Sequence, residues 1–85
     1  MAYRVQLRVS VDGDKGGVTT DLRNALVGAG LVKLPETGSY RGDQLTPQHL
    51  KTVLFQLGDL ASGKQNADGS SVGLDHLWIY VGPTD

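Results

Sequence analysis

Two carboxylates placed two positions apart are the side chains of this chain that could bind a cation. Asp12 and Asp14 lie in the polar, glycine-rich stretch 12–17, directly after a predicted strand. A calcium loop needs further oxygen ligands and a terminal glutamate, and a phosphate loop needs a Gly-Lys-Ser/Thr triplet. The stretch has neither pattern. A solvated turn without a cofactor is the favoured interpretation. The alternative makes Asp12 and Asp14 divalent-metal ligands and Asp12 the catalytic residue.

The two histidines are the other candidates for metal binding or proton transfer. His49 falls in the first turn of a predicted helix and His76 at the start of the last strand, and neither has a ligand partner nearby in sequence. Spacing suggests no nucleophile with a base and an orienting group. The chain has no cysteine, which excludes thiolate sites and disulfides. The sequence therefore favours a protein that is not an enzyme.

The last predicted strand carries the main signal for function. It alternates strictly from His76 to Val81, and successive side chains of a strand face opposite sides of a sheet. Leu77, Ile79 and Val81 are therefore expected in the core. The opposite face, which is usually polar in a half-buried strand, carries His76, Trp78 and Tyr80.

The first predicted strand, from Tyr3 to Val11, supplies basic neighbours for this aromatic face. Its odd positions are apolar, and its even positions are polar. Aromatic side chains beside arginines occur at protein interfaces and also on surfaces that stack nucleic-acid bases. The predicted interface or ligand face consists of Arg4, Arg8, His76, Trp78 and Tyr80.

The remaining patterns predict two helices and a hairpin. Apolar residues at helical spacing indicate one helix from about Val18 to Ala29, with Thr19 or Thr20 as N-cap. A second helix follows Thr46 as N-cap, and its apolar stripe is Leu50, Val53, Leu54, Leu57, Leu60 and Ala61. Between the helices, two short strands flank the turn residues 35–38. This order predicts an α+β, ferredoxin-like βαββαβ sandwich: a four-stranded antiparallel sheet with both helices on one face.

Length and composition predict a single domain over residues 1–85. Residues 62–73 are rich in Gly, Ser, Asn and Asp and lack a period, so we expect a flexible loop before the last strand. No run approaches the roughly 18 apolar residues of a membrane-spanning helix. The opening residues lack the apolar stretch of a signal peptide. A cytoplasmic protein without a membrane partner is the expectation.

Two short stretches spell recognition motifs of other proteins. Residues 34–38 read Leu-Pro-Glu-Thr-Gly, the sorting signal of Gram-positive cell-wall transpeptidases, and residues 41–43 read Arg-Gly-Asp, an integrin-binding tripeptide. A sorted substrate needs the pentapeptide near its C-terminus, whereas turn chemistry accounts for Pro35 and Gly38 where they stand. A turn is therefore favoured over a sorted surface protein, and the tripeptide is attributed to chance.

Residues 3 to 62 resemble the small CRISPR-associated protein that partners the spacer integrase, and its toxin relative VapD. The framework positions that carry the likeness are the opening strand with its carboxylate-bearing loop, residues 22–26, 30–34, 39–42 and 45–50. The closing residues 77–80 are similar to the last core strand of that family.

The resemblance implies a dimer with facing sheets and, for some members, a metal-dependent nuclease. The metal-binding aspartate of the family ends the first strand, where Ser10 stands in this chain; Asp12 fits only with a shift. Gly16 and Gly17 replace the basic residues that usually follow. The resemblance therefore supports the fold and a dimer more than catalysis.

Two functions are left open by the sequence. The favoured one is a small intracellular module, from a phage, mobile element or defence system, that forms a homodimer or binds a protein partner through its open sheet face. The alternative is a nucleic-acid-binding protein or metal-dependent nuclease of the CRISPR-associated type, with a divalent ion at Asp12. A formal net charge of −1 provides no overall basic field. Nucleic-acid binding would thus depend on a local patch.

Overall fold

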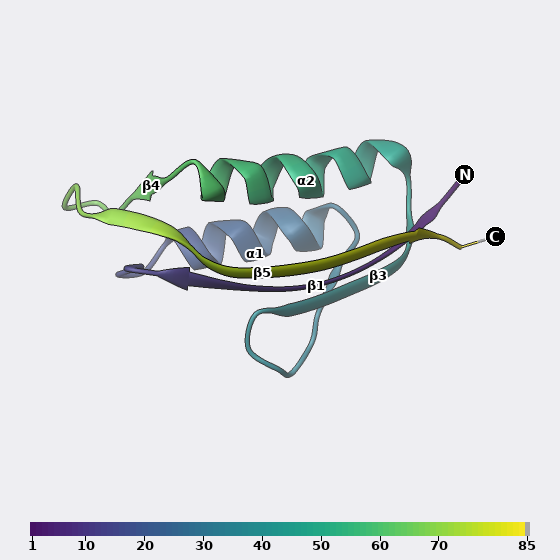
Figure 1. The fold of residues 1–85 in the computed structure, drawn as a ribbon, viewed down its shortest axis with the longest axis horizontal. Helices are drawn as coiled ribbons and strands as arrows, with labels where there is room; N and C mark the ends of the chain where they lie inside the picture. Colours follow the sequence, from purple (N-terminus) through teal and green to yellow (C-terminus); the bar gives the residue numbers. More distant parts are fainter. Residues whose placement is uncertain (85) are drawn as a thin grey trace.

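The computed structural model describes residues 1–84, which form an α+β fold with two helices and a five-stranded antiparallel sheet (Figure 1). The strands lie in the order β2-β3-β1-β5-β4. The elements are β1 (Tyr3–Asp12), α1 (Val18–Gly28), β2 (Val32–Lys33), β3 (Ser39–Leu45), α2 (Pro47–Ala61), β4 (Lys64–Gln65) and β5 (Ser71–Pro83). No helix in this range is both long and apolar enough to cross a membrane.

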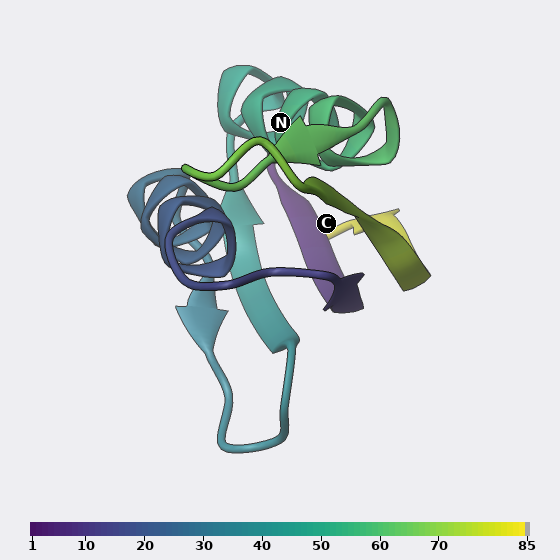
Figure 2. The ribbon, with the colours of Figure 1, turned by 90° about the vertical axis from the view of Figure 1, so that its left-hand side faces the viewer.

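Both helices cover the same side of the sheet. Figures 1 and 2 show α1 and α2 side by side over one face, while the loop between β2 and β3 projects beyond the other face. We call the helix-free side the open face. A sheet needs a covering layer where its side chains are apolar, so the two faces of β1 must differ in composition.

β1 is the central strand and pairs with both long neighbours. Its odd residues Val5, Leu7 and Val9 are buried against the helices, as their alternation predicts. The paired residues of β5 on the same side are Val81, Ile79 and Leu77. On the β3 side, Leu7 lies opposite Tyr40, which is also buried.

Local signals in the sequence explain where the helices begin and end. Thr46 caps α2 as predicted: its hydroxyl oxygen accepts a hydrogen bond from the backbone nitrogen of His49 at 3.1 Å, and Pro47 occupies the first helical position. α1 ends at Gly28, and Gly30 follows with φ +103°, a conformation that favours glycine. The prediction of Thr19 or Thr20 as N-cap of α1 was wrong, because that position is held by Gly17.

The sheet has five strands rather than the four predicted. The additional strand, β4, lies within residues 62–73, where no strand was expected, and pairs with Ser71 and Val72 at the start of β5. The turn between them is closed by a hydrogen bond from the backbone nitrogen of Asn66 to the carbonyl of Ser70 at 2.9 Å. A two-residue strand is too short to show a period of two, which is why the pattern was missed.

Four apolar side chains predicted for the core side are exposed instead. Leu54 on α2 is 48% exposed, Leu77 and Val81 on β5 are each 38% exposed, and Ala61 at the end of α2 is exposed as well. The buried stripe of α2 is narrower than predicted and consists of Val53, Leu57 and Leu60. β5 lies outside β1 and is only partly covered by α2, so its helix-facing side chains lie at the margin of the core.

Truncation of α2 should separate its core residues from its exposed ones. Leu57→Ala should lower the free energy of unfolding by about 2–5 kcal/mol, because Leu57 is only 3% exposed and its removal leaves a cavity. Leu54→Ala should cost less than about 1 kcal/mol, since that side chain keeps half its surface in water. Urea unfolding of both variants checks the difference, and equal losses would contradict this placement of α2.

Candidate functional site

The open face brings together all five side chains predicted for it. In the β1–β5 ladder Ser10 pairs with His76, Arg8 with Trp78, Gln6 with Tyr80 and Arg4 with Gly82. Side chains directly opposite in neighbouring antiparallel strands lie on the same face, with Cβ atoms about 5 Å apart. The polar residues of β1 and the aromatic residues of β5 therefore form two adjacent rows.

The two aromatic side chains of this face are largely in water. Trp78 is 57% exposed and Tyr80 is 50% exposed. A Cβ at Gly82 would collide with the Tyr80 hydroxyl, so the ring lies along the strand over a residue that has no side chain. Large exposed aromatic side chains next to arginines are a composition typical of interface centres.

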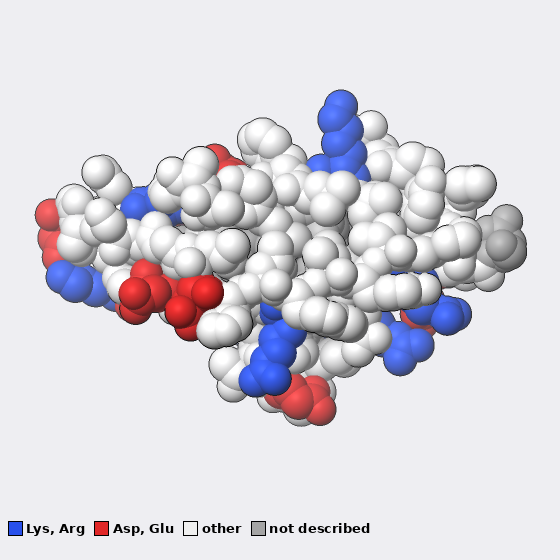
Figure 3. Space-filling view, in the orientation of Figure 1, with Lys and Arg blue, Asp and Glu red and all other residues white. Residues whose placement is uncertain are grey.

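β3 adds an ion cluster to the open face that the sequence analysis did not identify. Asp43 Oδ1 accepts a hydrogen bond from Arg41 Nε at 3.2 Å and forms an ion pair with Arg4 Nε at 3.4 Å. In Figure 3 basic side chains project from the lower, helix-free side of the molecule, and acidic side chains lie beside them. All three groups are about half exposed, so solvent screens their pairing and it contributes little to stability. Its effect is to hold two guanidinium groups at one end of the open face.

A β-bulge turns one further carboxylate towards this face. Ser10 pairs with His76 but Val11 pairs with Leu74, so Asp75 is an extra residue in β5. Its Oδ2 accepts from the Ser10 hydroxyl at 3.1 Å and lies 3.4 Å from His76 Nδ1. The carboxylate thus lies between the hydroxyl and the imidazole, and no Ser–His proton relay is formed. Leu74 and Leu77 are three positions apart, so they would face opposite sides of a regular strand. Two apolar residues at this spacing were the sequence signal for the bulge.

A shallow pocket of about 370 Å³ opens on the same face. It is lined by Arg8, Ser10, Thr37, His76, Leu77 and Trp78. Thr37 comes from the loop between β2 and β3, which is held against β1 by a hydrogen bond from Val9 N to Gly38 O at 2.9 Å. A Cβ at Gly38 would collide with the Val9 carbonyl, so this close approach requires glycine. One cation, two hydroxyls and an aromatic ring thus line the same hollow.

The structure separates the two carboxylates considered as metal ligands. Asp14 is engaged by the start of α1: its oxygens accept from the backbone nitrogens of Gly16 at 3.0 Å and Thr19 at 2.9 Å. Hydrogen bonding by the Thr19 side chain, and then by the backbone of Thr19 and Gly16, lowers the pKa of Asp14. Asp12 is exposed at the end of β1. Residues 1–84 contain no group of three or more His, Asp or Glu side chains that could hold a metal ion.

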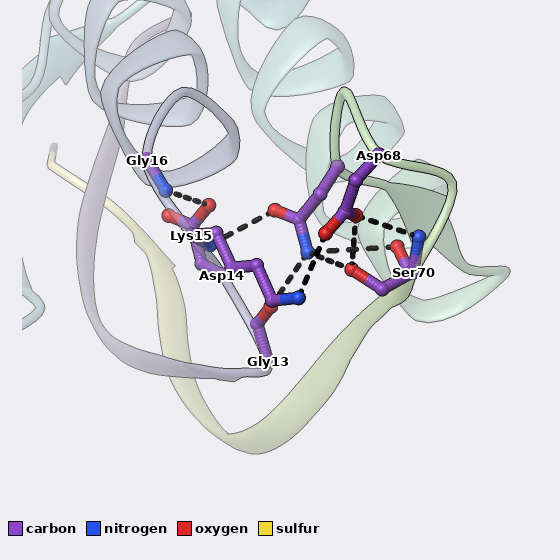
Figure 4. A network of polar contacts seen from close by, with 7 residues as sticks. Gly13, Asp14, Lys15, Gly16, Asp68 and Ser70 are labelled. Atoms are coloured by element: carbon purple, nitrogen blue, oxygen red, sulfur yellow. Dashed lines mark hydrogen bonds and ion pairs between the residues drawn. The ribbon is translucent and has the colours of Figure 1, made fainter.

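Asn66 joins the 12–17 loop to the turn after β4, and Figure 4 shows Gly13 and Lys15 of that loop facing Asp68 and Ser70 of the turn. Its side chain is buried, accepts from Lys15 N at 2.9 Å and donates to the carbonyl of Gly13 at 2.8 Å and to the Ser70 hydroxyl at 2.9 Å. An ion pair of 2.8 Å between Lys15 and Asp68 lies beside it. We call this network the loop clasp. It gives Lys15, Asn66, Asp68 and Ser70 a structural role.

No protein-family model, no curated protein and no solved structure matches this chain. The open face is therefore the feature of the structure that bears on function.

The loop clasp should make stability depend on pH in the acid range. The Lys15 ammonium, and then the hydrogen bonds of Ser70, lower the pKa of Asp68 from 3.8 to about 2. A carboxyl group whose pKa is lower in the folded state stabilises the fold above pH 3.8, and this contribution is lost as the pH falls through about 2. Asp68→Asn should therefore flatten the decline of the urea midpoint over this range.

The matched control for this measurement is Asp12→Asn. Asp12 is exposed and forms no ion pair or side-chain hydrogen bond with residues 1–84. Its replacement should leave the acid slope unchanged. An identical slope in Asp68→Asn and the wild type would show that Asp68 makes no such contribution.

Proposed function

We propose that this protein is a small cytoplasmic interaction module that acts without a cofactor. It binds a second copy of itself or another protein through the open face, with Arg4, Arg8, His76, Trp78 and Tyr80 as the contact residues. The observation that carries this proposal is the pair of half-exposed aromatic side chains beside arginines on a face that no helix covers. Contiguous exposed apolar patches of this kind mark sites where a protein binds a partner.

The proposal includes a ferredoxin-like fold with one added hairpin. If β4 is set aside, the strands follow the order β2-β3-β1-β5 with a helix in each crossover, and this supports the assignment. On this view β4 forms a short hairpin with the first residues of β5. The loop clasp stabilises that hairpin.

A nucleic-acid-binding protein of the CRISPR-associated type is the second candidate. The pocket supports it, because Arg8 could pair with a phosphate while Trp78 stacks on a base. The proposal of a nuclease depends on Asp12, which has no ligand set around it within residues 1–84. We therefore place this function after protein binding.

Association should be visible in solution and should depend on the aromatic row. At protein concentrations on the order of 10–100 µM, the wild type should form a complex that dissociates on dilution. Trp78→Ala should weaken it about tenfold or more, since interface tryptophans often contribute 2 kcal/mol or more. Val27→Ala, which changes a 47% exposed apolar residue on α1, should have no effect.

Sedimentation and the fluorescence of the single tryptophan report this association together. Trp78 emission should shift to shorter wavelength in the complex. For a partner other than a second copy, the same shift should appear when that protein is added. A monomer at all concentrations would end the homodimer form of the proposal.

Binding of single-stranded oligonucleotides tests the second candidate. Affinity should fall steeply with salt as phosphate contacts are lost, and Arg8→Ala should reduce the salt slope by about one contact. Cleavage that requires Mg²⁺ and disappears in Asp12→Ala, but not in Asp21→Ala, would establish the nuclease. An affinity that is the same at about 50 mM and about 200 mM salt would exclude phosphate recognition.

A further inference from the structure

The outer edge of β5 lacks the features that usually protect an edge strand. From Gly73 to Pro83 the strand has β1 on one side and no strand of residues 1–84 on the other, because β4 reaches only Ser71 and Val72. Edge strands are normally short, or carry charges, prolines or bulges. β5 has a bulge at Asp75 and a proline at 83, but residues 77–82 between them carry no charge. This central stretch is open to another strand.

The edge strands β2 and β4 of the same sheet differ from the open edge of β5 in length and charge. β2 consists of Val32 and Lys33, and Pro35 follows two positions later. β4 consists of Lys64 and Gln65. Both are short and carry a lysine, as protected edges do. Within residues 1–84, the β5 edge is the long uncharged one.

Side chains on both faces of this edge are only partly covered. Leu77 and Val81, on the helix side, are each 38% exposed, and Trp78 and Tyr80, on the open face, are 57% and 50% exposed. A neighbouring strand would cover all four at once, since cross-strand pairs form on both faces of a sheet.

α2 carries a separate apolar hollow, which it shares with Tyr3 at the start of β1 and which no β5 residue lines. Gln56 and Leu60 line a hollow against Leu22 of α1, which fixes the flank of α2 that faces the other helix. At 3.6 residues per turn, Leu50 and Leu54 lie on the opposite flank. With Phe55, which is 68% exposed, they border this separate hollow of about 500 Å³.

We propose that a second copy of this chain pairs antiparallel with the β5 edge, about a two-fold axis at Ile79. Residues 76–82 are self-complementary in this register: Trp78 meets Tyr80 of the second copy on the open face, and Leu77 meets Val81 on the helix side. A two-fold contact requires one surface to match itself. Aromatic and aliphatic side chains each meet their own kind, and no charge is buried.

Neighbouring registers are less favourable. Side chains must keep their face, so the axis can move only by whole residues. An axis at Tyr80 sets Trp78 against Gly82 and Leu77 against Pro83, which loses packing and a ladder hydrogen bond. An axis at Trp78 places the bulged residue Asp75 opposite Val81, where the ladder is interrupted.

This inference rests on the proposed function for the role of the open face, but it places the second copy at the β5 edge and leaves the open face to another protein. The two sheets become one continuous sheet, and the two open faces become a single surface with Trp78 and Tyr80 at its centre. The arginines of both copies then flank the aromatic groups and stay available to a further partner. A face-to-face dimer would bury those arginines instead.

Charge insertion on the two sides of the sheet distinguishes the two dimers. Val81→Lys adds a charge on the helix side at the β5 edge, outside the open-face pocket, and should weaken association about tenfold or more. Val32→Lys adds the same charge on the open face at the distant β2 edge, where Val32 is 63% exposed, and should have no effect. The reverse result would refute edge pairing and leave the open-face function standing. A monomeric wild type would refute both homodimers.

Single cysteines test the register, since the chain has none of its own. Ile79→Cys places two thiols opposite each other across the axis, about 5 Å apart at Cβ, and oxidation should yield a disulfide dimer. Leu77→Cys leaves its two thiols four residues apart along the strands, about 13 Å, and should remain unlinked. Cross-linking of Leu77→Cys but not Ile79→Cys would overturn the proposed axis. Circular dichroism of each variant confirms that the monomer is folded.

Discussion

The antiparallel ladder between β1 and β5 is the constraint on which the remaining structure depends. It runs from Tyr3 to Asp12 on one strand and from Gly73 to Pro83 on the other. Because side chains alternate, this register decides both what is buried and what is displayed. Val5, Leu7 and Val9 face the helices, and the polar residues between them lie beside Trp78 and Tyr80. A shift of one residue would exchange the two faces and remove the core.

The position of the helices decides which strand stays uncovered. α1 lies over the β2 side of the sheet, and α2 lies beside α1 on the side nearer β5 (Figure 2). No third helix of residues 1–84 covers β5. β1 lies beneath the helix layer and β5 lies at its margin. Leu77 and Val81 have the same residue types as the buried positions of β1, but they retain about a third of their surface. The exposure is a property of the arrangement, not of the side chains.

Two devices at the ends of β5 limit this open edge. At its start, the loop clasp holds the turn after β4 against the 12–17 loop through Asn66, so the first two residues of β5 are paired. At its end stands Pro83, which has no N–H to donate. The bulge at Asp75 also interrupts the regular β5 ladder near the start of the strand. What is left unprotected is the short apolar stretch around Ile79.

Strong local signals in the sequence predicted most of the secondary structure. The alternation of β1, the cap formed by Thr46 and Pro47, and the turn ending at Gly38 each depend on neighbouring residues alone. The faces of Arg8 and Trp78 were also predictable, because a strand has only two. For these elements the periodicity of two and the capping chemistry are sufficient.

The tertiary structure alone decided what surrounds these elements. Asn66 and Asp68 looked like ordinary loop residues, yet they bond to a loop more than fifty positions away. Leu54 and Leu57 are the same residue type on the same predicted apolar stripe. Only the packing of α2 makes the first exposed and the second buried. The reason is that hydrophobicity specifies which side chains avoid water, whereas burial depends on which element lies opposite. The sequence by itself determined the two long helices, the long strands and their faces. The fold determined the short β4 strand and left one edge of the sheet open.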